Sequence, residues 1–314
     1  MEKNSGGRQY RELVETARAD TRKLVKVERY NVVVAGNDKK KENLWIRGDE
    51  DPQAVYAIVT MDDPSTLNAL TPTLMMQLHD TLLELTTDPK IKVVILTGTD
   101  PAFCSGGHLG MIATGAKGVH ESVTDLTTPG SGTLEIWRWI RLQFGGVARL
   151  IANSNIVFVA AVNGAAAGVG LAFALACDVI IASEQAKFVS AFGRLGLVPE
   201  VGTSFFLTRK LGYQGALNLF LEGKHLTGAE ALQLGICQKC VPHDQLMTAS
   251  KAWVANALRL PPHTLEMSKV LLRSVMDLNF EASLRMEEFA EANCFSTRAL
   301  PFAADLILKK GSKL

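Results

Sequence analysis

The sequence has few cysteines, almost no net charge and no long apolar run. Its five cysteines form no paired framework, which favours a reducing compartment, and we expect a cytoplasmic protein. Lysines and arginines number 33 against 32 acidic residues, so the net charge of +1 gives no electrostatic reason to expect nucleic acid or an anionic membrane as a partner. No apolar run is long enough to span a bilayer, and the first residues carry no apolar signal core.

The composition is that of a globular protein with a sizeable core. The chain has 314 residues, of which 47% are apolar. Strand patterns alternate with helix patterns over residues 44–243, which indicates an α/β core, and helices dominate over residues 244–314. Residues 1–43 are polar and charged, and we expect them to form a helical extension. Its apolar residues at helical spacing are Tyr10, Leu13, Val14, Ala17, Leu24 and Val25.

One segment, residues 157–202, has a clear strand-turn-helix layout. A buried strand at 157–162 is followed by a turn at Asn163 and Gly164 and by a bend rich in glycine and alanine. This bend opens a helix of small residues that is expected to end near Asp178. Small residues let a ligand approach the backbone, and a helix N-terminus offers unpaired N–H groups to an anion. The segment therefore predicts a site for a phosphate, a carboxylate or a developing oxyanion.

A second strand runs into a similar loop earlier in the chain. Residues 92–98 have a buried-strand pattern, and the loop that follows contains Gly106 and Gly107. Neither loop has the lysine and hydroxyl residue that end a nucleotide P-loop, and neither has the full dinucleotide fingerprint. Two separate loops, each able to aim one N–H group, are what an acyl-transfer or enolate oxyanion hole requires.

These motifs together resemble the crotonase (enoyl-CoA hydratase/isomerase) superfamily. The matching segments are IVTMDDPSTLNAL at 58–70, AFCSGGHLG at 102–110, AAVNGAAAGVGLAFALACDVIIAS at 160–183 and LTGAEALQLGI at 226–236. They occur in the order that the family has, and the resemblance covers roughly residues 45–310.

The resemblance implies a fold, a substrate and an assembly. The fold is an α/β spiral of ββα units with a helical C-terminal region used for trimerisation, in a homotrimer or a dimer of trimers. The substrate is an acyl-CoA, so coenzyme A enters as part of the thioester and no cofactor is bound permanently. No metal site is expected, because the histidines lack the spacing of metal ligands.

The same resemblance assigns roles to backbone and side chains. By position in the matched motifs, Gly107 N–H and Val169 N–H are the two donors of the oxyanion hole. Val169 stands where the family usually has glycine, but the donor is a backbone group, and the helix beginning near Gly168 adds its dipole. Residues expected to contact the acyl-CoA are Phe103, Ser105, Leu109, Gly168, Phe192 and Lys310.

The acid–base residues differ from those of a hydratase. Hydratases of this family carry two glutamates, and the matching positions here are Ala172 and Phe192. Glu200 instead matches the single acid of the Δ3,Δ2-enoyl-CoA isomerases. One carboxylate suffices for a 1,3-proton shift, and its apolar neighbours Val198 and Val201 are expected to raise its pKa. The resemblance therefore favours an enoyl-CoA isomerase with Glu200 as acid and base, whereas the alternative for Glu200 is an exposed acid in a turn.

Three other interpretations stay open. His108, beside the predicted hole, could make the chain a hydrolase of thioesters or of β-diketone C–C bonds, or it could be a helix-start residue that points away. A hydratase could take its acid from in or beside residues 110–133, which form either a lid or a mobile insertion. The candidate groups there are His120, Glu121, Asp125 and Glu135. A non-catalytic member that binds CoA or RNA is least favoured, because the charge is nearly balanced.

Overall fold

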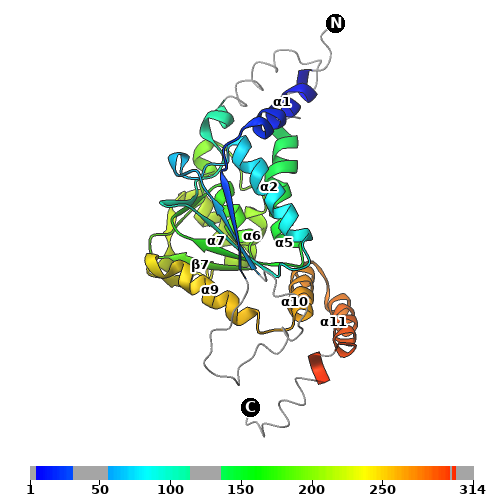
Figure 1. The fold of residues 1–314 in the computed structure, drawn as a ribbon. Coiled ribbons are helices and arrows are strands. Elements are labelled where there is room, and N and C mark those ends of the chain that lie inside the picture. Colours follow the sequence, from blue (N-terminus) through cyan, green and yellow to red (C-terminus); the bar gives the residue numbers. More distant parts are fainter. Residues whose placement is uncertain (1–4, 31–55, 114–135, 298, 302–314) are drawn as a thin grey trace, which may run out of the picture.

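The computed structural model describes residues 5–30, 56–113, 136–297 and 299–301. Within these ranges, two sheets and the helices around them form the predicted α/β spiral (Figure 1). Between residues 93 and 189, three successive pairs of strands each send the first strand to a larger sheet and the second strand to a smaller one. The fold class predicted from the sequence is therefore confirmed.

The two sheets are mostly parallel. The larger has six strands, in the spatial order β1 (Val25–Tyr30), β2 (Tyr56–Met61), β3 (Val93–Gly98), β5 (Val157–Val162), β7 (Val179–Ser183) and β10 (Lys239–Val241). The smaller has four, in the order β4 (Ala102–Cys104), β6 (Ala165–Ala167), β8 (Lys187–Val189) and β9 (His225–Thr227). Only β1 against β2 and β9 against β8 are antiparallel pairs within the described ranges.

Helices connect the strands and follow them. They are α1 (Ser5–Ala19), α2 (Pro72–Thr87), α5 (Gly145–Asn153), α6 (Val169–Ala176), α7 (Thr203–Glu222), α8 (Gly228–Gln233), α9 (Leu246–Ala257), α10 (Pro262–Ser274) and α11 (Phe280–Phe295). A π-helix, Ile140–Phe144, leads directly into α5. Short 3-10 turns are η1 (Pro64–Thr66), η3 (Gly193–Leu195), η4 (His243–Gln245) and η5 (Val275–Asp277).

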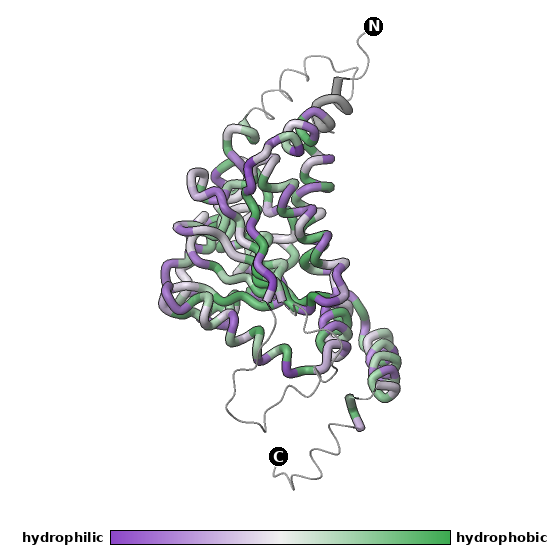
Figure 2. The backbone as a smooth tube through the Cα atoms, viewed as in Figure 1, coloured by the Kyte–Doolittle hydropathy of each residue, from purple (hydrophilic) through white to green (hydrophobic). Residues whose placement is uncertain are grey.

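Helices cover both faces of the larger sheet (Figure 1). One face, with α2, α5 and α6, holds the larger apolar cluster of the core, and α9 packs over β5 and β7 on the other face. Both β3 and β5 are buried along their whole length, because a parallel sheet covered on two sides has no solvent face. Figure 2 accordingly shows hydrophobic residues along the inner strands and mixed hydropathy on the outer helices.

The N-terminal part differs from the prediction of a helical extension. Although α1 is a helix, it ends at Ala19, and Leu24 and Val25 lead into a strand instead. That strand, β1, pairs with β2 in a register that starts at Val25↔Met61, so it is the edge of the larger sheet. Apolar residues at helical spacing also fit two elements separated by a turn, and here the turn follows Ala19. The predicted boundary at residue 43 lies outside the described residues.

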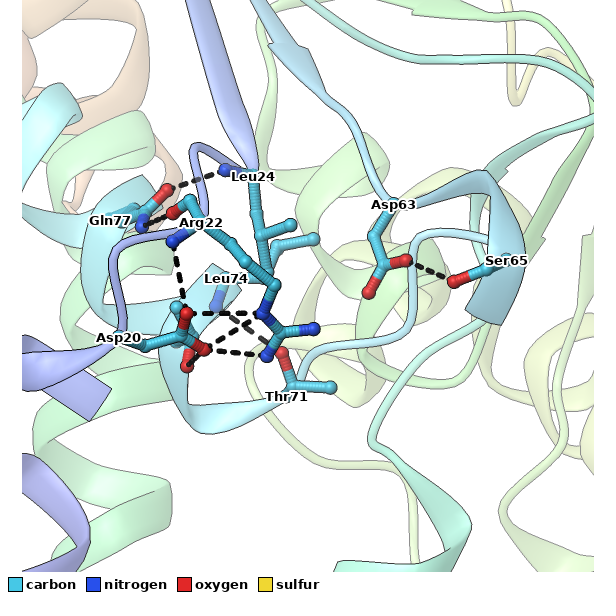
Figure 3. A network of polar contacts seen from close by, with 9 residues as sticks. Asp20, Arg22, Leu24, Asp63, Ser65, Thr71, Leu74 and Gln77 are labelled. Atoms are coloured by element: carbon cyan, nitrogen blue, oxygen red, sulfur yellow. Dashed lines mark hydrogen bonds and ion pairs between the residues drawn. The ribbon is translucent and has the colours of Figure 1, made fainter. Parts of the chain in front are cut away.

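Polar contacts hold the turn between α1 and β1 against α2 (Figure 3). The Gln77 side chain in α2 accepts from Leu24 N–H at 2.8 Å and donates to the main-chain oxygen of Arg22 at 2.6 Å. Asp20 Oδ2 accepts from Thr73 Oγ1 at 2.9 Å and pairs with the Arg22 guanidinium at 2.6 Å. Hydrogen bonds from Arg22 hold the pKa of Asp20 well below its usual range.

The C-terminal region is helical, as predicted, but its boundary is not a break in the chain. The turn η4 spans residues 243 and 244, and α9 packs against the larger sheet directly after it. Helix α11 contains no buried residue and exposes Phe280, Phe289 and Phe295. Trimerisation through this region stays a prediction. Among the residues that the structure describes, no helix is both long and apolar enough to cross a membrane.

A buried ion pair ties α10 to the core. Lys269 Nζ donates to the main-chain oxygens of Ile151 and Ile156, at 2.7 and 2.5 Å, and lies 3.0 Å from Asp178 Oδ2. Burial lowers the pKa of Lys269, and the charge of Asp178 opposes this shift. Arg273 binds the other oxygen of Asp178 at 2.9 Å. The Lys269 ammonium group is therefore surrounded by oxygen partners despite its burial.

The first prediction concerns this ion pair. Lys269→Met is expected to lower the free energy of unfolding by about 3 kcal/mol, because it leaves the main-chain oxygens of Ile151 and Ile156 without this buried donor and removes the buried positive charge beside Asp178. Lys224→Met is the control, since the Lys224–Glu230 pair is exposed and is expected to contribute less than about 1 kcal/mol. Denaturant unfolding monitored by circular dichroism measures both, and equal losses would contradict the role given to Lys269.

Candidate functional site

The two glycine-rich loops of the sequence lie side by side. They follow β4 and β6, which are parallel neighbours with Ala102 opposite Ala165. A Cβ atom on Gly170 would lie 2.2 Å from the oxygen of Cys104, so only glycine fits there. A Cβ on Gly106 would lie 3.6 Å from the nitrogen of Val169. The structure therefore brings the Gly106–Gly107 backbone next to the first turn of α6.

Two backbone N–H groups at this meeting point are free to bind a ligand. Leu70 N–H donates to the oxygen of Gly106 at 2.7 Å, which fixes the Gly107 loop on a neighbouring segment. Val169 is the first residue of α6, after Gly168 as its N-cap with φ of +53°. Within the described ranges, neither Gly107 N–H nor Val169 N–H has a hydrogen-bond acceptor. Both N–H groups are therefore available as donors, and the dipole of α6 favours an anion beside Val169.

Side chains that the sequence did not point to flank Gly107. A Cβ on Gly107 would lie 3.2 Å from Ile112 Cδ1 and 3.9 Å from Phe144 Cζ. Phe144 ends the π-helix, and its ring meets Trp139 edge-on at 6.1 Å between centroids. Turns of π-helix are rare and often occur at functional sites. No periodicity in the sequence distinguishes this turn from an ordinary helix, which is why Phe144 escaped prediction.

Glu200 is a half-buried carboxyl group just before α7. Burial raises the pKa of Glu200, and in the part of the chain that the structure describes its carboxylate has no hydrogen-bond or ion-pair partner. Of the two apolar neighbours expected to raise this pKa, only Val201 packs against the core, whereas Val198 is 73% exposed. Val201 has φ of +56°, a strained value for a β-branched residue that turns the chain into α7.

The positions that match the two hydratase glutamates are apolar. Ala172 and Phe192 are both buried, and Phe192 reaches within 4.0 Å of a Cβ built on Gly168. The N–H of Gly168 donates to Val189 at the end of β8, so this segment starts beside the Val169 loop. Glu200 lies further along the same segment. Neither matching position carries a group that can move a proton.

His108 follows Gly107 directly and is half-buried. Its main-chain oxygen accepts from Met111 N–H and Ile112 N–H, which begins a helical turn. The ring atom Nδ1 is buried, and no partner for it is found among the described residues. Leu109, the next residue, is 63% exposed. His108 is therefore at the site, although its ring makes no contact that assigns it a role.

The other residues predicted to contact the acyl-CoA lie in different environments. Phe103 is fully buried in the core cluster, so its side chain does not line an open channel as expected, because β4 is buried on every side. Ser105 is half-buried, and its hydroxyl donates to the oxygen of Thr66 at 3.2 Å. Lys310 lies outside the described residues. So do 114–133 of the predicted lid, together with Glu135.

Comparison with known proteins identifies the family. Residues 50–300 match the family model described as enoyl-CoA hydratase/isomerase. The chain belongs to this family. The 2,3-dehydroadipyl-CoA hydratase of Escherichia coli is 31% identical over 230 residues, which are 73% of this chain and 83% of that protein. A probable enoyl-CoA hydratase of Mycobacterium bovis is 30% identical over 241 residues, which are 76% of this chain and 86% of that protein.

Solved structures of the enoyl-CoA hydratase/isomerase family share the fold. A Thermobifida fusca structure in complex with CoA has a TM-score of 0.66 at 27% identity, covering 77% of this chain and 90% of that chain. An enoyl-CoA hydratase/isomerase of Cupriavidus metallidurans has a TM-score of 0.72 at 23% identity, which shows the fold alone. It covers 93% of this chain and 95% of that chain, so the similarity of fold extends beyond the residues of the family match.

Few chemically active groups lie at and beside the two loops in the described part of the chain. Groups of three or more metal-ligating side chains are absent from the described part of the chain. Two hollows lie elsewhere, one between α10 and α11 and one beside α9. The chemically active groups described at and beside the loops are two N–H donors, the His108 ring and, on the adjoining segment, the Glu200 carboxyl group with its raised pKa.

The second prediction follows from the raised pKa of Glu200. The folded state holds this proton to a higher pH than the unfolded chain, whose ordinary value is 4.5. Ionisation therefore destabilises the fold as the pH rises above the unfolded value, and the loss levels off above the folded value. Glu200→Gln is expected to raise the melting temperature relative to wild type more at about pH 8 than at about pH 4.

The control for this experiment is Glu222→Gln, an exposed carboxyl group at the end of α7, the helix that follows Glu200. It is expected to change the melting temperature equally at both pH values. A Glu200→Gln difference that stays flat or shrinks with rising pH would show that the carboxyl group is not buried in solution.

Proposed function

We propose that this chain is an enoyl-CoA isomerase that moves a carbon–carbon double bond from position 3 to position 2 of an acyl-CoA thioester. The observation that carries the proposal is Glu200, a half-buried carboxyl group with a raised pKa and no partner within the described ranges. At the two positions where family hydratases have glutamates, this chain has buried Ala172 and Phe192. A double-bond shift needs one group that takes and returns a proton, whereas hydration also needs a group that activates water.

The proposed reaction has two proton transfers. Glu200, ionised, takes a proton from C2 of the 3-enoyl thioester, and the electron pair moves to the thioester oxygen. Gly107 N–H and Val169 N–H hold this oxygen as an enolate, with the dipole of α6 in support. The protonated Glu200 then returns the proton to C4, the double bond forms between C2 and C3, and the carbonyl is restored. No atom is gained or lost, and no resident cofactor or metal is needed.

The raised pKa suits Glu200 to this cycle. A carboxyl group with a pKa closer to neutrality is a better acceptor for a carbon acid than an ordinary surface glutamate, and it still releases the proton at C4. Its lack of a cationic partner among the described residues keeps the pKa from falling. Desolvation of the Glu200 carboxyl group, and not an ion pair, therefore gives it the pKa that the proposed reaction needs.

The substrate class and the assembly are part of the proposal. The Thermobifida fusca structure was solved with CoA, and the Escherichia coli relative is named for an acyl-CoA substrate, which supports an acyl-CoA here. Ser105 and Leu109 remain candidates to line the path of the CoA chain, Gly168 and Phe192 the acyl end, and Lys310 a phosphate contact. We propose a cytoplasmic homotrimer or dimer of trimers, with no nucleic acid or membrane partner.

Hydratase chemistry is the second candidate. It is favoured by the names of the relatives and by His108, whose unpartnered Nδ1 follows directly on Gly107. A neutral imidazole can activate water or, with a thioester, support hydrolysis. In either reaction Glu200 would not be the essential group, which separates the two candidates in one experiment.

The third prediction tests the isomerase. Glu200→Gln is expected to lower conversion of a 3-enoyl-CoA to the 2-enoyl isomer by roughly a thousandfold, because the amide keeps the shape but accepts no proton. Affinity for CoA is expected to stay unchanged. His108→Gln and Glu222→Gln serve as controls that should isomerise at near the wild-type rate.

Product analysis by mass spectrometry decides the outcome. A gain of about 18 mass units, the mass of one water molecule, reports hydration, whereas isomerisation leaves the mass unchanged. Hydrated or hydrolysed product that survives Glu200→Gln and disappears in His108→Gln would overturn the isomerase in favour of the second candidate.

A further inference from the structure

We infer that Asp100, bonded to Asn163 and His243, sets the spacing of the two loops that carry the N–H groups of Gly107 and Val169. This inference rests on the oxyanion hole proposed above. Asp100 lies in the turn between β3 and β4, at the opposite end of β4 from Gly107. It touches no reacting atom in the proposed reaction and is therefore a positioning residue.

The Asp100 carboxylate receives hydrogen bonds from two other parts of the fold. Asn163 Nδ2 lies 2.8 Å from Asp100 Oδ1, and the same amide donates to the oxygen of Ala102 at 3.2 Å. His243 Nε2 lies 3.1 Å from Asp100 Oδ2. Asp100 precedes β4 and Asn163 precedes β6, so this one contact joins the starts of the two strands whose ends carry the N–H donors.

His243 also contacts Ser183 through its other ring nitrogen. Ser183 Oγ lies 3.0 Å from His243 Nδ1 and accepts from Gln185 N–H at 2.9 Å. A carboxylate only accepts, so Nε2 of His243 carries a proton in its contact with Asp100. The order Ser-His-Asp matches that of a hydrolase triad, but Ser183 is fully buried and has no access to a substrate.

The distance from this contact to the N–H donors is short. β4 and β6 each contain only three residues, and they are hydrogen-bonded neighbours that open with Ala102 opposite Ala165. At their far ends the loops meet backbone to backbone, with Gly170 against the oxygen of Cys104. Close-packed elements transmit a displacement instead of absorbing it, so a shift at the start of β4 moves Gly107 relative to Val169.

The exposure of the contact allows it to be tested without unfolding the protein. The Asp100 side chain is 61% exposed and that of His243 is 28% exposed. Both line a hollow of about 280 Å³ beside α9. An exposed pair of this kind contributes little to global stability, so its main effect is on local geometry.

The test uses acetoacetyl-CoA as a probe of the hole. This β-ketothioester forms a coloured enolate, and donors to the enolate oxygen lower the pH at which the bound probe ionises. Titration of the bound probe by ultraviolet absorbance therefore measures the strength of the hole without turnover. Asp100→Asn keeps the size of the side chain but breaks at least one of its two hydrogen bonds. Its enolate stabilisation is expected to be about tenfold weaker than that of wild type, with unchanged affinity for CoA.

Two further comparisons separate geometry from charge. Asp244→Asn removes the same charge one residue from His243, at an exposed position, and is expected to titrate as wild type does. His243→Ala should weaken the enolate as Asp100→Asn does. His243→Gln is expected to keep most of the wild-type enolate stabilisation, because the glutamine amide can still donate to Asp100.

The outcomes distinguish this inference from the proposed function. If wild type does not lower the ionisation pH of the bound probe, the oxyanion hole is absent and both proposals fail. If wild type lowers it and Asp100→Asn lowers it equally, the positioning role alone is overturned. Weaker binding of CoA and probe alike, or a large fall in the melting temperature, would also overturn it, because these are signs of a general structural role.

Discussion

The close approach of two backbones is the constraint on which the site depends. The loop after β4 and the first turn of α6 meet with no room for a side chain, since a Cβ on Gly170 would lie 2.2 Å from the oxygen of Cys104. The loop backbone thus lies next to the first turn of α6, and neither Gly107 N–H nor Val169 N–H has an acceptor in the described part of the chain. The fully buried strands behind the loops keep that arrangement fixed.

Burial then determines which chemistry the loops can support. Two N–H donors stabilise any thioester enolate, and the fold shared with the relatives is compatible with several reactions. In the proposed function the supply of proton carriers decides the reaction, because Ala172 and Phe192 are apolar and buried while Glu200 is half-buried and unpartnered within the described ranges. Under this proposal the residues beside the two N–H donors select the reaction, and the donors themselves serve every candidate reaction.

The sequence predicted best where the signal is local. The strand at 157–162, the turn after it and the glycine-rich loops were read correctly because each depends on neighbouring residues. Prediction failed where distant segments decide: Leu24 and Val25 were assigned to a helix but lead into β1, whose pairing with β2 spans a long separation in sequence. Phe103 was assigned to a channel but is buried, and Phe144 was missed, because burial and the π-helix both arise from packing across the fold.

The edge strand β1 also limits how the chain can be shortened. A recombinant protein trimmed to the limits of the family match at residues 50–300 would lack β1 and the turn that Gln77 holds. β2, a strand of six residues that is mostly buried, would become the new edge with half of its backbone groups unpaired. An apolar strand exposed in this way is a template for pairing with another chain. The trimmed protein is therefore expected to aggregate, which would prevent a measurement of its activity.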